Sequence, residues 1–393
     1  MKIAILTSGI LPVPAVQGGA VENLIDFYLE YNDKHQLHDI TIYSVKHPDV
    51  KRTTDNSSKV NHYCYIQLNG FWAKVKKYIY QKKHQNGYYH HSVEFFFEQA
   101  YKDILKKDYD LIIVENRPGY ALKLKERSKI PSILHLHNDF LSKDTFKAKE
   151  IFDGYNRIIC VSDYIAKRVQ VISPTTQGKC IIVNNSIDLA KFEKALPAAK
   201  KKLGLSSKNF IIVYSGRLTE EKGILQLVQA VKQTKMIPSL KLLIIGASTY
   251  GKDKHPTSFI NKLKEESEPI KDEVVFTGFV NYERVPSYLK LADIAVVPSM
   301  WEEPFGLTIV EAMAVGLPLI TTRSGGIAEI CEGVATIVER DNIVHNLASA
   351  ILDLYQHPEK RKQMSDASLE RSKMFDKETY ARNFFKALEE NAI

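Results

Sequence analysis

The chain has 393 residues, 44% of them hydrophobic and 25% charged, which favours two globular domains over a single core. No apolar run approaches the roughly 18 residues that span a bilayer, and four scattered cysteines without a Cys-x-x-Cys pair argue against a zinc or disulfide framework and suit a reducing cytoplasm. The net charge is +8, and residues 1–196 hold 28 Lys and Arg against 21 Asp and Glu, which points to an anionic surface or substrate for that half.

Short apolar runs alternate with amphipathic stretches along the whole chain. The run after Met1 has one lysine and no small-residue cleavage site, so it predicts a β-strand rather than a signal peptide. The predicted buried strands are Ile3–Leu6, Ile40–Tyr43, Leu111–Val114, Ile133–Leu136 and Ile158–Val161, followed by Ile211–Tyr214, Leu240–Ile245, Val274–Phe276, Ile294–Val297 and Leu319–Thr321. Strands alternating with helices predict βαβ units, and the restart after residue 200 predicts two open parallel sheets in an α/β fold.

The apolar rhythm breaks near residues 190–206, where Leu196-Pro197-Ala198-Ala199 and a run of three lysines occur. We therefore predict an N-terminal domain over 1–195 and a C-terminal domain over 196–375. Periodic aromatic and apolar residues near the end predict a final helix over about 376–393. Because open parallel sheets bind ligands beyond the carboxyl ends of their strands, the polar residues in those loops are the candidate ligand contacts.

Gly18-Gly19 follows the first strand, and a helix is expected from about Ala20. Backbone N–H groups at a helix start can approach a phosphate or sugar when no side chain intervenes. A plain surface loop explains this pair equally well, so both interpretations stay open.

The segment Ser215 to Gly223 follows a predicted strand and contains Arg217 and Lys222 between Gly216 and Gly223. A guanidinium fork can bind a phosphate bidentately, and an ammonium adds a mobile charge, so the pair suits a diphosphate. A solvated charged loop is the alternative, but two cations between two glycines directly after a strand favour a functional site.

Glu303 and Glu311 lie in the most informative segment, which runs from Glu302 to Ala314. Glu303 is expected in a loop and Glu311 about one turn into a helix that begins near residues 306–308. Carboxylates accept hydrogen bonds from vicinal sugar hydroxyls, and the free N–H groups of the helix start can bind phosphates. An acidic first turn that complements the helix dipole would explain Glu303 weakly and does not explain Glu311.

His135 and His137 alternate along one strand and therefore share a face of the sheet. Two histidines at this spacing could bind a metal, but the sequence shows no third ligand nearby, so we expect no metal site. A histidine that contacts substrate is favoured for His137, and a hydrogen-bonded core histidine remains an alternative for His135.

Two further motifs lie in the N-terminal half of the chain. Asp108-Tyr109-Asp110 matches an Asp-x-Asp pattern that chelates divalent cations in some sugar-nucleotide enzymes, but it lies before a strand, at the strand's amino end, so we expect a structural role. In the stretch 71–83, lysines alternate with aromatic residues. It predicts an interfacial helix on an anionic membrane, a patch for an anionic acceptor, or a solvated helix with an aromatic core stripe. No nucleic-acid-binding motif occurs.

Three segments together resemble the signature of glycosyltransferase family 4: Gly18-Gly19, Gly216-Arg217 with Lys222-Gly223, and Glu303-Pro304-Phe305-Gly306-Leu307 with Glu311-Ala312. The resemblance covers the chain from end to end, and the two glutamates separated by seven residues are its most specific part. It implies the GT-B fold, two Rossmann-like domains whose parallel sheets face each other across a cleft. Leu11-Pro12-Val13-Pro14 before Gly18-Gly19 also resembles the branch that contains spore coat protein SA and exopolysaccharide transferases.

The resemblance implies a role for each candidate residue. Arg217 and Lys222 would contact the donor diphosphate, Glu311 the ribose hydroxyls and Glu303 the donor sugar, and His137 matches the family's cleft histidine. These residues, apart from Glu311, form the implied catalytic set. Further donor contacts would come from Gly18, Gly19, Gly216, Val280, Phe305, Gly306, Leu307 and Thr308. One departure from the family pattern is Ser186, where glycine is frequent.

The implied activity is that of a retaining hexosyltransferase that uses a nucleoside diphosphate sugar, by family frequency a UDP-sugar, in polysaccharide biosynthesis. The acceptor would be a glycan, a lipid-linked molecule or a protein. No metal and no cofactor are expected, because cations and a helix start can stabilise the leaving diphosphate. The expected location is the cytoplasm, with peripheral contact to the inner membrane face as one option.

Two alternative functions share the GT-B fold. A sugar-nucleotide epimerase would turn over a donor without any acceptor, whereas a phosphorylase would need a pyridoxal-binding lysine, for which there is no candidate. A non-catalytic partner subunit of another transferase would tend to lose the phosphate-binding cations, and both Arg217 and Lys222 are present.

Overall fold

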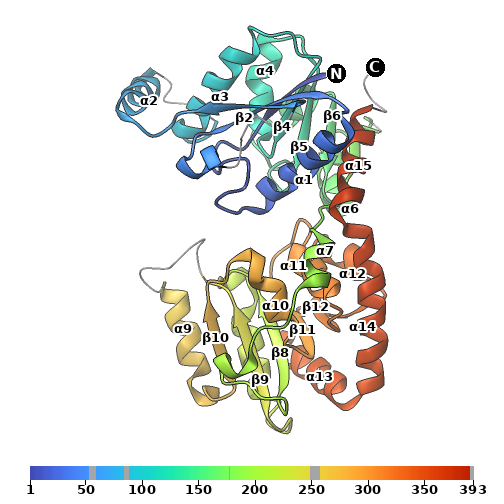
Figure 1. Ribbon diagram of the computed structural model, residues 1–393. Coiled ribbons are helices and arrows are strands. Elements are labelled where there is room, and N and C mark those ends of the chain that lie inside the picture. Colours follow the sequence, from blue (N-terminus) through green and yellow to red (C-terminus); the bar gives the residue numbers. More distant parts are fainter. Residues whose placement is uncertain (53–58, 84–87, 177, 248–256, 390–393) are drawn as a thin grey trace. The chain divides into compact units, whose positions relative to one another are not determined.

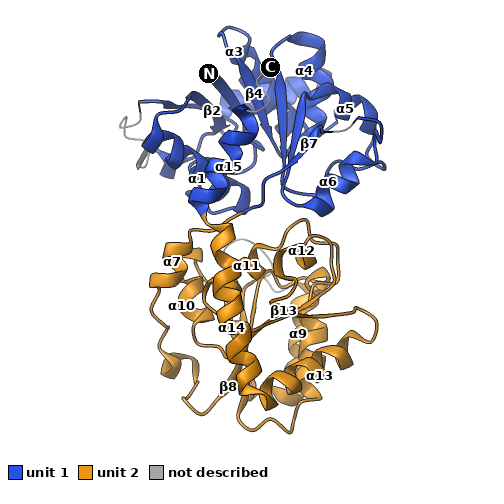
Figure 2. Ribbon diagram, turned by 90° about the vertical axis from the view of Figure 1, so that its right-hand side faces the viewer, with its two compact units in different colours: residues 1–185, 377–393 blue, residues 186–376 orange. Residues whose placement is uncertain are grey.

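The computed structural model describes residues 1–52, 59–83, 88–176, 178–247 and 257–389 (Figure 1). The chain forms two compact units: Met1–Asn185 together with Lys377–Ile393, and Ser186–Asp376 (Figure 2). The chain therefore passes between the units after Asn185 and again after Asp376, whereas the sequence placed the first passage at 195. The end of the predicted final helix, 390–393, lies outside the described residues.

Unit 1 is built on a parallel sheet of strand order β3-β2-β1-β4-β5-β6-β7. Its strands are β1 (Lys2–Leu6), β2 (Asp39–Val45), β3 (Asn61–Ile66), β4 (Leu111–Glu115), β5 (Ser132–Leu136), β6 (Arg157–Cys160) and β7 (Cys180–Ile182). The central strands are mostly apolar and buried on both faces of the sheet, with Glu115 and His135 as buried polar exceptions at the carboxyl ends of β4 and β5. The sequence missed β3 and β7, which form the two edges and are only partly buried.

The helices of unit 1 are α1 (Ala20–His35), α2 (Phe71–Lys83), α3 (His91–Ile104), α4 (Ala121–Arg127), α5 (Ala148–Gly154), α6 (Asp163–Gln170) and α15 (Lys377–Glu389). The last of these, α15, confirms the predicted final helix and packs against α1. The Tyr28 ring of α1 stacks on Phe384 of α15, with ring centroids 4.2 Å apart. Both rings belong to the core that covers one face of the sheet.

Unit 2 repeats the design with a parallel sheet of order β10-β9-β8-β11-β12-β13. Its strands are β8 (Phe210–Ser215), β9 (Leu240–Ile245), β10 (Val274–Gly278), β11 (Ile294–Val297), β12 (Leu319–Thr322) and β13 (Ala335–Val338). Its helices are α7 (Leu189–Lys194), α8 (Ile224–Lys232), α9 (Ser258–Ser267), α10 (Val285–Leu289), α11 (Leu307–Ala314), α12 (Ile327–Cys331), α13 (Ile343–Gln356) and α14 (Pro358–Ser372).

Helices α8 and α13 contribute the apolar residues that cover one face of this second sheet. Helix α11 contacts β11, β12 and α14. The predicted α/β class with two parallel sheets is confirmed. In the described ranges, no helix combines the length and the apolar character that crossing a membrane requires.

Candidate functional site

The loops after β8 and β11 in unit 2 lie directly against each other. The amide of Met300 donates a 2.8 Å hydrogen bond to the carbonyl of Glu221. Gly223 has φ of +70°, and a Cβ there would lie 1.8 Å from the carbonyl oxygen of Pro298, so only glycine fits. Parallel strands β8 and β11 are neighbours and end at the same edge, so their loops carry the predicted polar residues to one place.

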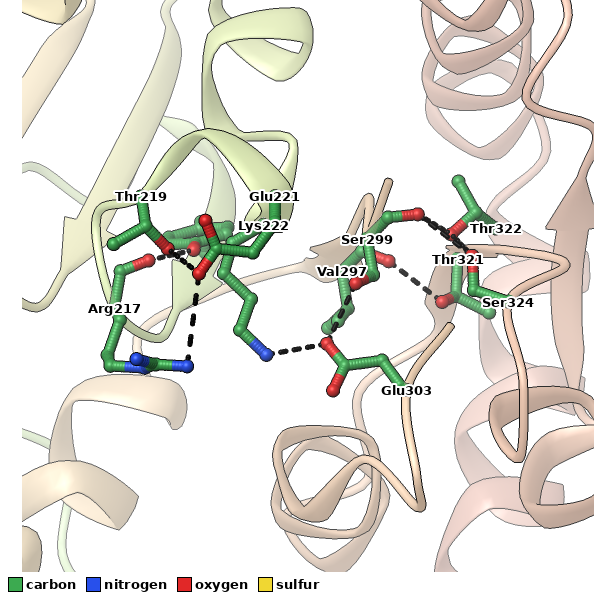
Figure 3. Close-up of polar contacts among 11 residues, drawn as sticks. Arg217, Thr219, Glu221, Lys222, Val297, Ser299, Glu303, Thr321, Thr322 and Ser324 are labelled. Atoms are coloured by element: carbon green, nitrogen blue, oxygen red, sulfur yellow. Dashed lines mark hydrogen bonds and ion pairs between the residues drawn. The ribbon is translucent and has the colours of Figure 1, made fainter. Parts of the chain in front are cut away.

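Arg217 extends from the first of these loops with its guanidinium exposed. The hydroxyl of Tyr214 donates a 2.7 Å hydrogen bond to the Arg217 carbonyl, which fixes the backbone under the side chain. The nearest carboxylate oxygen, Oε1 of Glu221, is 3.9 Å from the guanidinium and also accepts a 2.7 Å bond from Thr219 (Figure 3). The guanidinium is therefore held loosely and can bind an anion.

Lys222 and Glu303 form an ion pair across the two loops. The Lys222 ammonium lies 2.6 Å from Oε1 of Glu303 and 5.1 Å from the ring centroid of Trp301. Glu303 is largely buried, and Oε1 also accepts a 2.7 Å bond from the hydroxyl of Ser299. The sequence assigned Lys222 and Glu303 to different parts of a donor, and it did not foresee that they bind each other.

A chain of buried hydroxyl groups lies behind Glu303. Thr322, the last residue of β12, and Ser324, which follows that strand, donate hydrogen bonds of 2.6 and 2.9 Å to the carbonyl of Ser299. Thr321 donates a parallel 2.8 Å bond to the carbonyl of Val297. Sequence reasoning missed this chain, although three hydroxyl residues among four at the end of an apolar strand were a signal.

Glu302, the neighbour of Glu303, has a structural role. Its carboxylate accepts a 2.5 Å hydrogen bond from the amide of Gly325 and forms an ion pair with Arg340. Gly325 has φ of +52°, and a Cβ there would lie 2.3 Å from the Glu303 carbonyl oxygen. These contacts fix the loop on which Glu303 stands.

Glu311 lies within α11, on the predicted turn of the predicted helix. Burial raises the pKa of its carboxyl to about 7, and the Tyr282 hydroxyl and Lys191 counteract this only in part. A buried carboxyl group with so few partners is costly unless a ligand supplies hydrogen bonds. Its environment therefore suits a site for donated hydroxyl groups.

The start of α11 offers backbone donors, as the sequence suggested. Gly306 is its N-cap with φ of 103°, and no side chain caps the helix. The neighbouring Phe305 side chain is buried, with its ring centroid 5.8 Å from that of Phe375, so it faces the core. Leu307 and Thr308 are half-buried, and so is Val280, which follows β10.

In unit 1, the predicted Gly18-Gly19 pair has φ of 74° and 112°, and α1 begins at Ala20 as expected. A Cβ on Gly19 would lie 2.2 Å from Oε2 of Glu22. Glu22 itself is buried, and burial raises its pKa. The sequence gave no reason to single out Glu22, which occupies an ordinary first-turn position.

His135 and His137 share one carboxylate, that of Glu115 at the end of β4. Glu115 lies 3.2 Å from Nδ1 of His135 and 3.0 Å from Nε2 of His137, and it accepts a 2.9 Å bond from Tyr28. Burial acts to raise the pKa of Glu115, but the two histidines outweigh it and lower the pKa to about 2. Burial and the neighbouring His135 lower the pKa of His137, which keeps it neutral.

The expectation that no third ligand lies near the two histidines is wrong. Parallel pairing of β4 with β5 places Glu115 beside His135, so candidate ligand atoms of all three residues lie within 4.8 Å of one another. The carboxylate already accepts hydrogen bonds from both rings, which explains the cluster as a buried proton-sharing network. Among the described residues, Nε2 of His135 and Nδ1 of His137 have no hydrogen-bond partner.

Asp110 has the structural role expected of it. Its carboxylate accepts a 2.7 Å hydrogen bond from the amide of Lys2, which ties the amino ends of β1 and β4 together. Tyr109 lies 3.0 Å from the hydroxyl of Tyr43. These contacts are at the edge opposite to the strand ends that carry His137.

Helix α2 does not form the aromatic core stripe considered above. Phe71 and Trp72 are 74% and 73% exposed, and Ala73 is its only buried residue. The five lysines of α2 make no ion pair with any residue in the described part of the chain. The helix is solvated, as that interpretation expected, but among its aromatic residues it is the half-buried Tyr80 that packs inward, with its ring centroid 6.1 Å from that of Phe95, so no continuous core stripe forms.

Known proteins resemble this chain in sequence. The family model described as glycosyl transferases group 1 matches residues 197–371. Spore coat protein SA of Bacillus subtilis is 29% identical over the full length of both chains. UDP-Gal:alpha-D-GlcNAc-diphosphoundecaprenol alpha-1,3-galactosyltransferase of Escherichia coli is 27% identical over 58% of this chain and 61% of its own.

Solved structures extend the likeness to both units. Anabaena Alr3699/HepE, determined in complex with UDP, has a TM-score of 0.73 and 19% identity over 99% of this chain and 100% of its own. At this identity the likeness concerns the fold, and it confirms the predicted pair of domains built on parallel sheets. The chain thus has the GT-B fold of two parallel-sheet domains, and its residues 197–371 match the family model of glycosyl transferases group 1.

Proposed function

We propose that this protein transfers a hexose from a UDP-sugar to a hydroxyl group of a glycan, lipid-linked or protein-linked acceptor. One observation carries the proposal. In unit 2, the adjacent loops after β8 and β11, together with helix α11, hold two cationic side chains and two buried carboxyl groups. The cations Arg217 and Lys222 suit a diphosphate, and Glu303 and Glu311 suit hydroxyl groups. UDP-galactose is the donor in the name of the E. coli relative.

The proposed reaction retains the anomeric configuration. The bond between the sugar C1 and the diphosphate oxygen breaks, and the acceptor oxygen bonds to C1 on the same face. The acceptor proton passes to the departing phosphate oxygen, so no side chain is needed as a base. The Arg217 guanidinium, the Lys222 ammonium and the start of α11 stabilise the charge on the leaving diphosphate, and the proposal includes no metal or cofactor.

The donor assignment is tested by thermal shift with a panel of nucleoside diphosphate sugars, because a bound ligand raises the melting temperature. A UDP-hexose is expected to give the largest shift. Arg217→Ala should abolish that shift and the transfer of sugar, whereas Arg382→Ala, at an exposed arginine of α15, should leave both unchanged. No shift with any nucleotide sugar would contradict the proposal.

The same protein preparation separates the alternatives. An epimerase would convert the bound donor to its epimer when no acceptor is present, whereas a transferase would not. A non-catalytic partner subunit would support sugar transfer in cells equally well with Arg217→Ala. Loss of transfer with this variant therefore favours catalysis by this chain.

We also propose that the protein works in the cytoplasm, in peripheral contact with an anionic membrane through α2. The exposed Phe71 and Trp72 can enter the interfacial region, and lysines follow them along the helix, which contains no acidic residue. Tyr78 and Ile79 are also exposed, so about half of the apolar residues of α2 face solvent. Each lysine near an anionic surface adds about 1 kcal/mol.

Flotation with vesicles tests the membrane proposal. The protein should float with vesicles of phosphatidylglycerol and phosphatidylcholine, and less with phosphatidylcholine alone or at high salt. Phe71→Ser with Trp72→Ser should release it, while Leu196→Ser, which removes an exposed apolar residue of unit 2, should not. Unchanged flotation of the double variant would show that α2 is not the contact.

A further inference from the structure

The two carboxylate oxygens of Glu303 have different surroundings. Oε1 is bound on two sides, by the Lys222 ammonium at 2.6 Å and by the Ser299 hydroxyl at 2.7 Å. Oε2 takes no hydrogen bond from any residue in the described part of the chain, and it is not among the fully enclosed polar atoms. Figure 3 shows Oε2 directed away from both partners of Oε1.

The backbone of Ser299 is held by hydrogen bonds to its carbonyl. Its side chain is fully buried, and its carbonyl accepts the hydrogen bonds of Thr322 and Ser324, which are fully buried too. The Thr322 and Ser324 hydroxyls are 3.0 Å apart, so the two donors also contact each other. Buried hydrogen-bonded groups of this kind fix a single arrangement because any other leaves a polar atom unpaired.

These hydroxyls are not required to fill the protein interior. Valine or alanine would fill such positions without a polar atom to satisfy. The series of hydrogen-bonded hydroxyl groups ends at the Glu303 carboxylate. The position of the Ser299 hydroxyl therefore fixes the rotation of the Glu303 side chain. A carboxylate that presents one oxygen to a ligand binds that ligand more tightly when its other oxygen is already held in place. Little side-chain entropy is then lost on binding.

We propose that Ser299 is a positioning residue that holds Oε1 of Glu303 and thereby presents Oε2 to the hydroxyl groups of the donor sugar. The inference deepens the proposed function and rests on it. Lys222 contributes to the same orientation, since its ammonium occupies Oε1 and leaves Oε2 as the free acceptor. The sugar-binding oxygen is thus selected before the donor arrives.

The test compares UDP with UDP-glucose and UDP-galactose by calorimetry. Ser299→Ala should leave the dissociation constant of UDP nearly unchanged, because UDP lacks the sugar. The dissociation constant of the preferred UDP-hexose should rise about tenfold, the loss expected for one hydrogen bond to a charged group. The ratio of the two constants therefore reports the orientation of Glu303 and not general stability.

Thr321→Val is the matched control. It removes a buried hydroxyl of the same strand end whose bond goes to Val297 and not to Ser299. Its melting temperature should fall, but the ratio of dissociation constants should stay at the wild-type value. In the Glu303→Ala background, Ser299→Ala should cause no further change in the ratio.

The outcomes separate this inference from the proposed function. If the wild-type protein binds neither UDP nor a UDP-hexose, the proposed function is wrong. Suppose that the wild type binds both ligands. If Ser299→Ala then leaves the ratio of the two dissociation constants unchanged, including the case in which both constants rise equally, Ser299 has no positioning role. A tenfold change in the ratio that persists in the Glu303→Ala background would also overturn it.

Discussion

Replacing Glu311 by glutamine should stabilise the protein and weaken donor binding at the same time. Burial raises the pKa of Glu311 from 4.5 to about 7, so the folded state holds a proton that the unfolded state releases above 4.5. The protonated Glu311 carboxyl contributes to the free energy of unfolding in full below pH 4.5, and this contribution is lost as the pH rises through 7. The shift corresponds to about 3 kcal/mol at pH 8.

Glu311→Gln removes this penalty, because an amide carries no charge at any pH. At pH 8 the variant should melt at a higher temperature than the wild type, and at pH 5 the difference in stability should shrink to about 1 kcal/mol. Donor binding should change in the opposite direction, because ribose hydroxyls donate to a carboxylate more strongly than to an amide. In the wild type, donor affinity should fall about tenfold for each pH unit below 7, and in the variant it should be flat.

Calorimetric melting and donor titration at pH 5, 6, 7 and 8 measure both effects. Glu339→Gln is a suitable control, because the Glu339 side chain is exposed and pairs with Arg323 at the surface. For this variant, neither the melting temperature nor the donor affinity should change with pH as it does for Glu311→Gln. A variant that is less stable than the wild type at pH 8 would refute the reasoning, since the buried carboxyl group would then be well satisfied without a ligand.

Three further outcomes are expected. Glu115→Gln should lower the melting temperature at pH 7 and remove the loss of stability as pH falls from 4.5 toward 2, because the carboxyl with the lowered pKa is gone; an unchanged acid profile in pH-dependent melting would contradict this. Gly223→Ala should abolish UDP binding, since its Cβ meets Pro298, whereas Gly204→Ala, with open space around it, should cost only about 1 kcal/mol and bind normally. Sugar transfer should be unaffected by EDTA, and metal analysis of the purified protein should find no stoichiometric ion; activity that depends on an added divalent cation would contradict the proposed chemistry.

The sequence predicted those parts of the fold that depend on long apolar runs. Central strands of a parallel sheet are buried on both faces, so they stand out as continuous apolar segments. Strands β3 and β7 lie at the edges and lack such runs, and β13 is half-buried along its length. The passage after Asn185 was placed late because the lysine run beyond it suggested a linker, whereas that stretch belongs to unit 2.

At the candidate site, residue types were predictable and their partners were not. Arg217, Lys222, Glu303 and Glu311 could be selected because each follows a strand or enters a helix at an unusual place. The ion pair of Lys222 with Glu303 joins residues far apart in the sequence and depends on the pairing of β8 with β11. Glu115 was missed for the same reason, since only the register of β4 against β5 brings it to His135.

The position of α15 has a consequence for the synthesis of the protein. Unit 1 contains the first 185 residues, yet part of its core is supplied by α15, which is synthesised after the whole of unit 2. Unit 2 is continuous in the chain and can complete its fold earlier, although it begins later. Until α15 has been synthesised, Tyr28 lacks the ring of Phe384 against which it stacks, and the nascent unit 1 exposes an apolar stripe. A stop codon or a protease cut before residue 377 would therefore destabilise the beginning of the chain and spare its middle.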